Sequence, residues 1–209
     1  MEMLIQVGVV LASYLVGSLS FAVIVSRLMG LNDPRSYGSK NPGATNVLRS
    51  GSKKAAILTL LLDAMKGWLP VALVLAYGPE YGLGPQEAAL AGLAAFLGHL
   101  YPVFFGFAGG KGVATAVGVV IGVHGLLALA TVLTFVIVVY FSRYVSLASM
   151  VAAVFAPAFY LFGDGVAWQA SASEVLSLAI MALLLVWRHR ENINRLLAGT
   201  ESQLGKKKA

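Results

Sequence analysis

Residues 38–49, Gly-Ser-Lys-Asn-Pro-Gly-Ala-Thr-Asn-Val-Leu-Arg, form the longest polar stretch of a chain that is otherwise mostly apolar. Gly38, Pro42 and Gly43 interrupt helix and strand alike, which leaves backbone N–H groups to point at an anion. Arg49 presents a planar guanidinium that fits a phosphate through two hydrogen bonds. Side chains that donate to oxygen come from Ser39, Asn41, Thr45 and Asn46. The stretch predicts a phosphate-binding loop, and the alternative is a solvated basic loop beside a membrane.

A second glycine-rich stretch, Gly109-Gly110-Lys111-Gly112, comes shortly before Thr115 at the start of an apolar segment. It resembles a phosphate loop, because a helix that begins after such a turn attracts anions at its N-terminus. The spacing of a Walker A motif is missing, so nucleotide binding is not supported.

Two charged residues, Asp63 and Lys66, lie within an apolar run, one helical turn apart on the same face. Charges inside a membrane span are costly and usually functional. The alternatives are an ion pair that only positions the helix, or a lysine that extends to the inner interface. His99, just before Pro102, is either a structural group or a catalytic one.

The start of the C-terminal tail, residues 188–195, is basic, and His189, Asn192 and Arg195 fall on one face at helical spacing. That face can close over a substrate. The alternative is that a basic segment beside the membrane only binds anionic lipid head groups.

Composition indicates an all-α integral membrane protein, because the 209 residues are 58% hydrophobic and only 11% charged. With no cysteine, disulfides, a thiolate nucleophile and a cysteine metal site are excluded. The net charge of +6 fits cytoplasmic basic loops better than nucleic-acid binding. A single domain over residues 1–209 is expected, and residues 3–28 are too long for a signal peptide.

The apolar segments predict the membrane topology. A span needs roughly 20 apolar residues. Clear candidates are residues 3–28, 57–77, 88–105, 145–162 and 174–187. Residues 113–141 fit either one long span or two short ones that meet in a turn at His124-Gly125.

The charges decide between these two topologies. With residues 31–54 in the cytoplasm, a single crossing by residues 113–141 would put Arg143 and the basic tail outside. Two crossings return all 15 lysines and arginines to the inner side, and leave only acids in the outer loops. The expectation is therefore seven transmembrane helices, with the N-terminus outside and the C-terminus cytoplasmic. Residues 113–123 measure about 16 Å as a helix, so the glycine-rich turn before them is expected to be re-entrant.

All four polar groups then lie on the cytoplasmic side of a lipid phase. Such a one-sided cluster predicts an enzyme that joins a phosphorylated compound to an apolar one. A membrane anion or phosphate transporter is the alternative, but it needs access from both faces, often with inverted repeats, and neither is visible. A non-catalytic scaffold gives no reason for four phosphate-friendly loops on one side.

Taken together, residues 38–49, 63–67, 98–115 and 188–195 resemble the PlsY family, the bacterial acyl-phosphate:glycerol-3-phosphate acyltransferases. The resemblance covers nearly the whole chain, and the motifs are specific as an ordered set. The departures are small: Lys40 stands where the family often has glycine, and Ala108 where a charged or small residue is common.

The resemblance implies transfer of a fatty acyl group from acyl phosphate to the 1-hydroxyl of glycerol 3-phosphate, giving lysophosphatidic acid and phosphate. No histidine here begins a His-x-x-x-x-Asp pair, so the protein must mainly position two anions and neutralise their charge. Catalytic roles are expected for Ser39, Arg49, Lys111, His189 and Asn192. Substrate or phosphate binding is expected for Gly38, Asn41, Gly43, Thr45, Asn46, Lys66, His99, Gly109, Gly110, Gly112, Thr115 and Arg195. Asp63 is expected to support the site, and the base is His99, His189 or a substrate phosphate.

No metal and no cofactor are expected. The expected partners are acyl phosphate, glycerol 3-phosphate and membrane lipids, without nucleic acid, and the expected location is the bacterial inner membrane with the active site on its cytoplasmic side. The sequence says nothing about oligomeric state or acyl-chain length.

Overall fold

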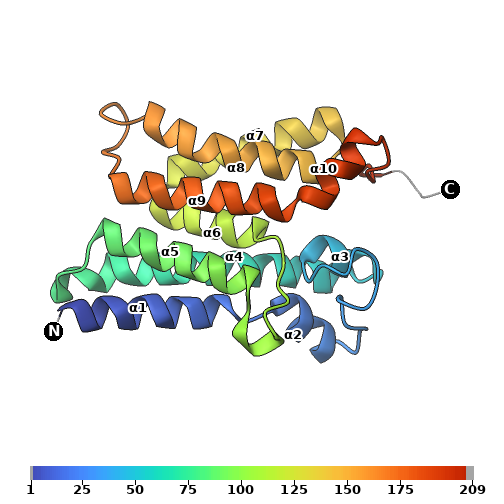
Figure 1. Ribbon diagram of the computed structural model, residues 1–209, viewed down its shortest axis with the longest axis horizontal. Helices are drawn as coiled ribbons and strands as arrows, with labels where there is room; N and C mark the ends of the chain where they lie inside the picture. Colours follow the sequence, from blue (N-terminus) through green and yellow to red (C-terminus); the bar gives the residue numbers. More distant parts are fainter. Residues whose placement is uncertain (1, 206–209) are drawn as a thin grey trace. The chain divides into compact units, whose positions relative to one another are not determined.

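The computed structural model describes residues 2–205, and over those residues the regular elements are all helices (Figure 1). The predicted all-α architecture is therefore confirmed. The helices divide into two compact units, Met1–Val123 and His124–Ala209. The expectation of a single domain over the whole chain remains a prediction.

The first unit is built on the long helix α4, which lies against α5 and α6, while α1 packs on α5 and α4. Its elements are α1 (Glu2–Gly17), α2 (Phe21–Leu28), α3 (Ala44–Leu48), α4 (Lys53–Tyr77), η1 (Gly78–Tyr81), α5 (Pro85–Leu100), η2 (Val103–Phe105) and α6 (Val113–Val123). Within this unit the connections around α3 and η2 lie at one end, and the N-terminus and η1 lie at the other (Figure 1). The two glycine-rich polar stretches thus share one end of the unit, as predicted.

Small residues let these helices approach closely, which is how helices associate where lipid removes the hydrophobic driving force. A methyl group at Gly118 of α6 would collide with the carbonyl oxygen of Ala64 of α4. One at Gly67 of α4 would collide with the carbonyl oxygen of Thr115. The two glycines fix the contact between α4 and α6, and with it the point where the second polar stretch enters its helix.

The segment predicted as one helix over residues 3–28 is interrupted, and α1 and α2 meet at a bend of 44°. The break follows Gly17 and contains Ser18 and Ser20, which are weak helix formers. An interruption in lipid needs new partners for its backbone, and the Lys66 ammonium donates to the Leu19 carbonyl at 2.7 Å. A residue distant in sequence therefore supplies the hydrogen bond that the backbone lacks at the break, which explains why the local sequence did not predict it.

The second unit contains α7 (Gly125–Ser142), α8 (Val145–Phe162), α9 (Ala172–Arg188) and α10 (Arg190–Leu197), with α8 between α7 and α9. A capping box starts α9, since the Glu174 carboxylate accepts from the Ser171 backbone N–H at 3.0 Å and the Ser171 hydroxyl accepts from the Glu174 backbone N–H at 3.3 Å. The turn between α7 and α8 and helix α10 lie at one end of this unit, and the connection after α8 lies at the other (Figure 1).

By length and composition, four helical segments can cross a membrane, or six if each bent pair counts as one span. The four are Lys53–Tyr81, Pro85–Phe105, Gly125–Ser142 and Val145–Phe162, and the pairs are α1 with α2 and α9 with α10. The helix break at His124 lies where the turn was predicted, and α6 has the expected short length. The protein is thus an integral membrane protein, and the count of seven depends on whether α6 crosses.

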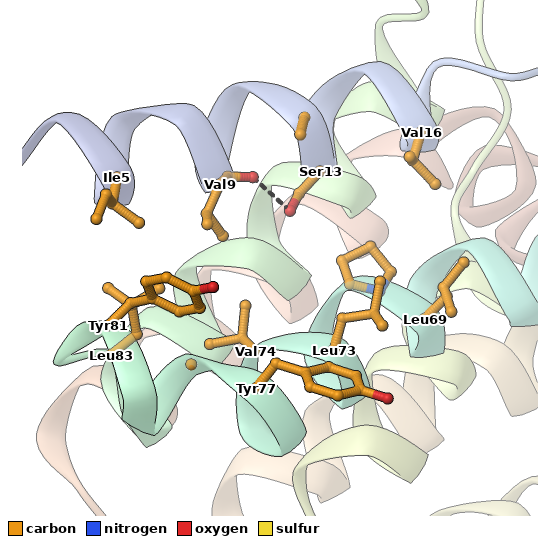
Figure 2. A pocket seen from close by; sticks show the side chains of 13 residues that line it. Ile5, Val9, Ser13, Val16, Leu69, Leu73, Val74, Tyr77, Tyr81 and Leu83 are labelled. Carbon is orange, nitrogen blue, oxygen red and sulfur yellow. Dashed lines mark hydrogen bonds between the residues drawn. The ribbon is translucent and has the colours of Figure 1, made fainter.

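An apolar cavity of about 390 Å³ lies between α1, α4 and η1 (Figure 2). The hydroxyl of Ser13 points along its own helix and donates to the Val9 carbonyl at 2.7 Å (Figure 2). The remaining lining is almost entirely hydrocarbon. This cavity does not fit a phosphate, and none of the predicted site residues lines it.

Candidate active site

The first polar loop, residues 38–49, is organised around the buried side chain of Asn46. Its amide donates to the carbonyl oxygens of Pro34 at 2.6 Å and Tyr37 at 3.1 Å. Its oxygen accepts from the backbone N–H of Ser39 at 3.0 Å. Gly38 has φ +60°, and a Cβ there would collide with the Asn46 oxygen. Asn46 was predicted to bind substrate, but the structure gives its polar atoms a task inside the loop.

This arrangement leaves the other polar side chains of the loop on its surface. Ser39, Thr45 and Arg49 are exposed, and Asn41 is half-buried. The Arg49 guanidinium donates to the Asn46 oxygen at 3.4 Å, which orients it toward the loop. The loop can therefore offer a cation, hydroxyls and an amide to an anion on its outer surface.

The second polar loop contacts both His99 and the first loop. The backbone N–H of Gly110 donates to the His99 carbonyl at 3.2 Å. A Cβ at Gly110 would lie 2.9 Å from the carbonyl oxygen of Pro42 and would collide with the His99 imidazole. A Cβ at Gly109 would collide with the His99 and Leu100 carbonyls. The two glycine-rich stretches therefore contact each other, and glycine has the room at these contacts that a Cβ would not.

Beneath the loops lies a buried group of charged residues. The Lys66 ammonium lies 2.8 Å from the Asp63 carboxylate, and the Nδ1 of His99 lies 3.7 Å from the same oxygen. Their exposed fractions are 3%, 2% and 7% for Lys66, Asp63 and His99, so none of them faces open solvent. Of the alternatives for Asp63 and Lys66, the ion pair is present.

Thr115 is fully buried in α6 against Gly67, and its hydroxyl has no hydrogen-bond partner among the described residues. It was expected to bind phosphate at the start of this helix. Its place between α4 and α6 instead makes it part of the helix contact, and its binding role remains a prediction.

In the second unit, His189 and Asn192 are buried, and Asn192 and Arg195 converge on a residue that sequence reasoning missed, Glu201. The Glu201 carboxylate accepts from Asn192 at 2.6 Å and from Arg195 at 2.7 Å. It also accepts from the hydroxyl of Ser146, at the start of α8, at 2.7 Å. An acid within a basic tail was the available signal for this role.

Glu201 stays ionised in this setting. Burial alone would raise its pKa, but the hydrogen bonds from Ser146, Asn192 and Arg195 outweigh burial and lower the pKa below its ordinary value. The carboxylate therefore joins α8 to α10 as an anion.

His189 is held by its own helix, since its Nδ1 lies 2.8 Å from the Leu185 carbonyl. A carbonyl only accepts, so Nδ1 carries the hydrogen, and Nε2 is the basic nitrogen of the neutral ring. The side chain can then accept a proton or a hydrogen bond through Nε2.

Within residues 2–205, no group of three or more His, Asp or Glu residues is placed to hold a metal ion. The described residues instead offer cations, hydroxyls and backbone N–H groups at one end of each unit. These features define an all-helical integral membrane protein with polar groups of the kind that bind anions at one end of each unit.

Comparison with known proteins identifies the family. The sequence profile described as glycerol-3-phosphate acyltransferase matches residues 7–199. The chain belongs to the glycerol-3-phosphate acyltransferase family, which confirms the resemblance drawn from its motifs.

Individual relatives agree with this assignment. The glycerol-3-phosphate acyltransferase of Albidiferax ferrireducens is 66% identical over 99% of this chain and 92% of its own length. That of Bordetella petrii is 61% identical over 98% of this chain and 95% of its own length. The crystal structure of PlsY (YgiH) in its glycerol 3-phosphate form is 40% identical, with a TM-score of 0.87 and 96% coverage of both chains. Its lysophosphatidic acid form is 39% identical, with a TM-score of 0.85 and coverage of 96% and 95%.

Proposed function

We propose that this protein transfers a fatty acyl group from acyl phosphate to the 1-hydroxyl of glycerol 3-phosphate. The products are lysophosphatidic acid and inorganic phosphate, in the first acylation step of phospholipid biosynthesis. The observation that carries the proposal is the contact of Gly110 with Pro42, which joins two anion-binding loops in a chain of this family. The solved relatives named for glycerol 3-phosphate and for lysophosphatidic acid support the acceptor and the product.

The donor is the one that the family resemblance implies, and the residues suit its chemistry. An acyl phosphate is a mixed anhydride whose leaving group is a stabilised anion, so it needs little acid catalysis. Ser39, Arg49 and Lys111 bind and neutralise the phosphates, while His189, Asn192 and Arg195 act on glycerol 3-phosphate. Preorganised cations of this kind stabilise the charge that develops on the leaving phosphate.

In the transfer step the 1-hydroxyl oxygen attacks the acyl carbonyl carbon. A new ester C–O bond forms, and the C–O bond to phosphate breaks. The electron pair of that bond leaves with inorganic phosphate, and the hydroxyl proton passes to a phosphate oxygen of a substrate. This route requires no side chain to act as the base.

The proposal places the loops in the cytoplasm. The chain then crosses the bacterial inner membrane seven times, with α6 as a short span and the N-terminus outside. The lysines and arginines of both units support this orientation, because basic residues favour the cytoplasmic side.

The test is to offer the purified protein acyl phosphate, acyl-CoA and acyl carrier protein thioesters separately, with glycerol 3-phosphate, and to measure lysophosphatidic acid by mass spectrometry. We expect product from acyl phosphate alone. Product from a thioester alone would overturn the donor, and anion flux in liposomes without product would favour a transporter.

A further inference from the structure

A line of polar contacts runs through the first unit from the α1–α2 break to the second polar loop. It passes from the Leu19 carbonyl to Lys66, Asp63 and His99, with steps of 2.7, 2.8 and 3.7 Å, and ends at Gly110. We call these five residues the buried tie. The tie links α4 and α5 to the loop through charges that would be costly in lipid unless they were compensated.

His99 forms the end of the tie that meets the loop. The Nδ1 edge of its ring faces the Asp63 carboxylate, and its Nε2 edge packs against the backbone of Gly110. The same Gly110 lies against the Pro42 carbonyl of the first loop and donates to the His99 carbonyl. The ring therefore supports the point where the two anion-binding loops meet.

We propose that His99 is a positioning residue, which holds residues 109–112 against the first loop and does not act on the substrate hydroxyl. Asp63 orients the imidazole, and Lys66 neutralises Asp63. The inference rests on the proposed function, because it assigns the tie to the binding of glycerol 3-phosphate or acyl phosphate by these loops. It replaces the expectation that His99 binds substrate or serves as the base.

The positioning role predicts where kinetic effects appear. The loop binds phosphate both in the ground state and in the transition state, so loosening it removes uniform binding and raises KM with little change in kcat. A general base acts only in the transition state and contributes about 10²–10⁴-fold to kcat. The two roles therefore separate in a KM-against-kcat comparison.

His99→Ala and His99→Gln provide the first comparison. Glutamine places an amide nitrogen as many bonds from Cα as Nε2 is, so it can support Gly110, but it cannot accept a proton at neutral pH. We expect His99→Ala to raise KM for a phosphorylated substrate at least about tenfold, a loss equivalent to about 1.4 kcal/mol, with kcat nearly unchanged. His99→Gln should recover most of that loss, and the pH–rate profile should persist in both. A loss of more than about a hundredfold in kcat in His99→Gln, together with the pH dependence, would overturn the proposal.

A mutant cycle with Gly110→Ala tests the contact itself. In the wild-type background the added methyl group collides with the ring, and in the His99→Ala background only its 2.9 Å approach to the Pro42 carbonyl oxygen remains. The KM increase caused by Gly110→Ala should therefore be much smaller in the second background. If the KM increase of the double variant equals the product of the two single increases, within about twofold, the two residues do not interact. That result would overturn the proposal.

Asp63→Asn separates positioning from structural support. The substitution removes the counter-charge of the buried Lys66, so thermal stability should fall in either background. The KM increase should appear in the wild-type background and be absent on top of His99→Ala, because Asp63 acts through the ring. If Asp63→Asn raises KM and lowers thermal stability in both backgrounds, Asp63 has only a structural role.

The matched control is Thr59→Val, one turn before Asp63 on α4. Thr59 is also fully buried, its hydroxyl has no partner among the described residues, and valine has nearly its shape. KM should not change.

Calorimetric binding of glycerol 3-phosphate without a donor repeats each comparison independently of turnover. If wild-type protein binds glycerol 3-phosphate but transfers nothing from acyl phosphate, the proposed function fails while the tie is still tested.

Discussion

Under the proposed function, Arg49 and Lys111 are the cations that the two polar loops contribute to phosphate binding. A hydrogen bond to a charged group is worth about 1.5–3 kcal/mol, so Arg49→Ala and Lys111→Ala should each reduce kcat/KM at least about tenfold. Lys54→Ala, which removes an exposed lysine at the start of α4, is the matched control and should leave activity unchanged. Steady-state kinetics on folded, detergent-purified protein measure the effect. Wild-type activity in either loop variant would remove that residue from the site.

Asn46 shapes the first loop from inside, and its substitution should affect stability as well as activity. Asn46→Ala leaves the carbonyls of Pro34 and Tyr37 and the Ser39 N–H without their partner, which costs about 1–3 kcal/mol where such groups are buried. Asn46→Asp has the same shape but faces two carbonyl oxygens with a carboxylate, so it should be no more stable than Asn46→Ala. Thermal unfolding measures both.

The exposed Ser36→Ala serves as the control for Asn46 and should unfold at nearly the wild-type temperature. An Asn46→Asp protein as stable as wild type would mean that the amide does not hold the loop together.

At the residue scale, the sequence indicated the loop but not the task of each side chain. The carbonyls that occupy Asn46 belong to Pro34 and Tyr37, and main-chain acceptors leave no signal in a single sequence. Lys40 is the opposite case. The resemblance suggested glycine at this position, and the φ of +56° at Lys40 lies in the left-handed region that glycine favours.

At the scale of elements, the Glu201 carboxylate fastens α10 to the start of α8, and this contact should depend on pH. The pKa of Glu201 is lower in the folded protein than its ordinary value of 4.5. The ionised carboxylate therefore stabilises the contact between α10 and α8. The stabilisation is complete above about pH 4.5 and is lost as the pH falls through the lowered pKa. In acid, amide hydrogen-exchange protection should therefore decrease more in α10 than in the other helices of the second unit.

Glu201→Gln should show weaker protection of α10 at neutral pH and little further change in acid. Glu191→Gln, at an exposed acid of the same helix, should behave as wild type. If the acid sensitivity of α10 survives in Glu201→Gln, another group controls it.

The lengths of the apolar segments predicted where the helices lie, but they predicted only some of the breaks between helices. The break at His124 was visible because two short crossings fit the charges better than one long crossing. The break between α1 and α2 was not visible, since it depends on Lys66 donating to Leu19 across 47 residues. Glu201 was missed for the same reason, because Ser146, one of its three partners, lies 55 residues away.

At the scale of the whole molecule, the sequence-based topology depends on charge. Within each unit the structure places basic residues at one end: the loop of Arg49 in the first, and Arg143 with α10 in the second (Figure 1). In the first unit the opposite end carries η1 with Glu80, and in the second it carries the connection with Asp164. Each unit is therefore polarised along its helices, as the positive-inside rule requires of a membrane protein with a cytoplasmic basic end.

Cysteine labelling tests whether α6 and α7 are two crossings, because the chain contains no cysteine of its own. Single cysteines at Ser50, Gly84, Ser142 and Val166 place one thiol in each informative connection. Val166 is 88% exposed, whereas its neighbour Gly165 has φ +70° and would be strained by a side chain. With seven spans, a membrane-impermeant reagent should label Gly84→Cys and Val166→Cys from outside in intact cells. It should label Ser50→Cys and Ser142→Cys only after permeabilisation. Ser142→Cys decides the point, because labelling it from outside would mean that residues 113–141 cross only once, and the basic tail would then lie outside with it.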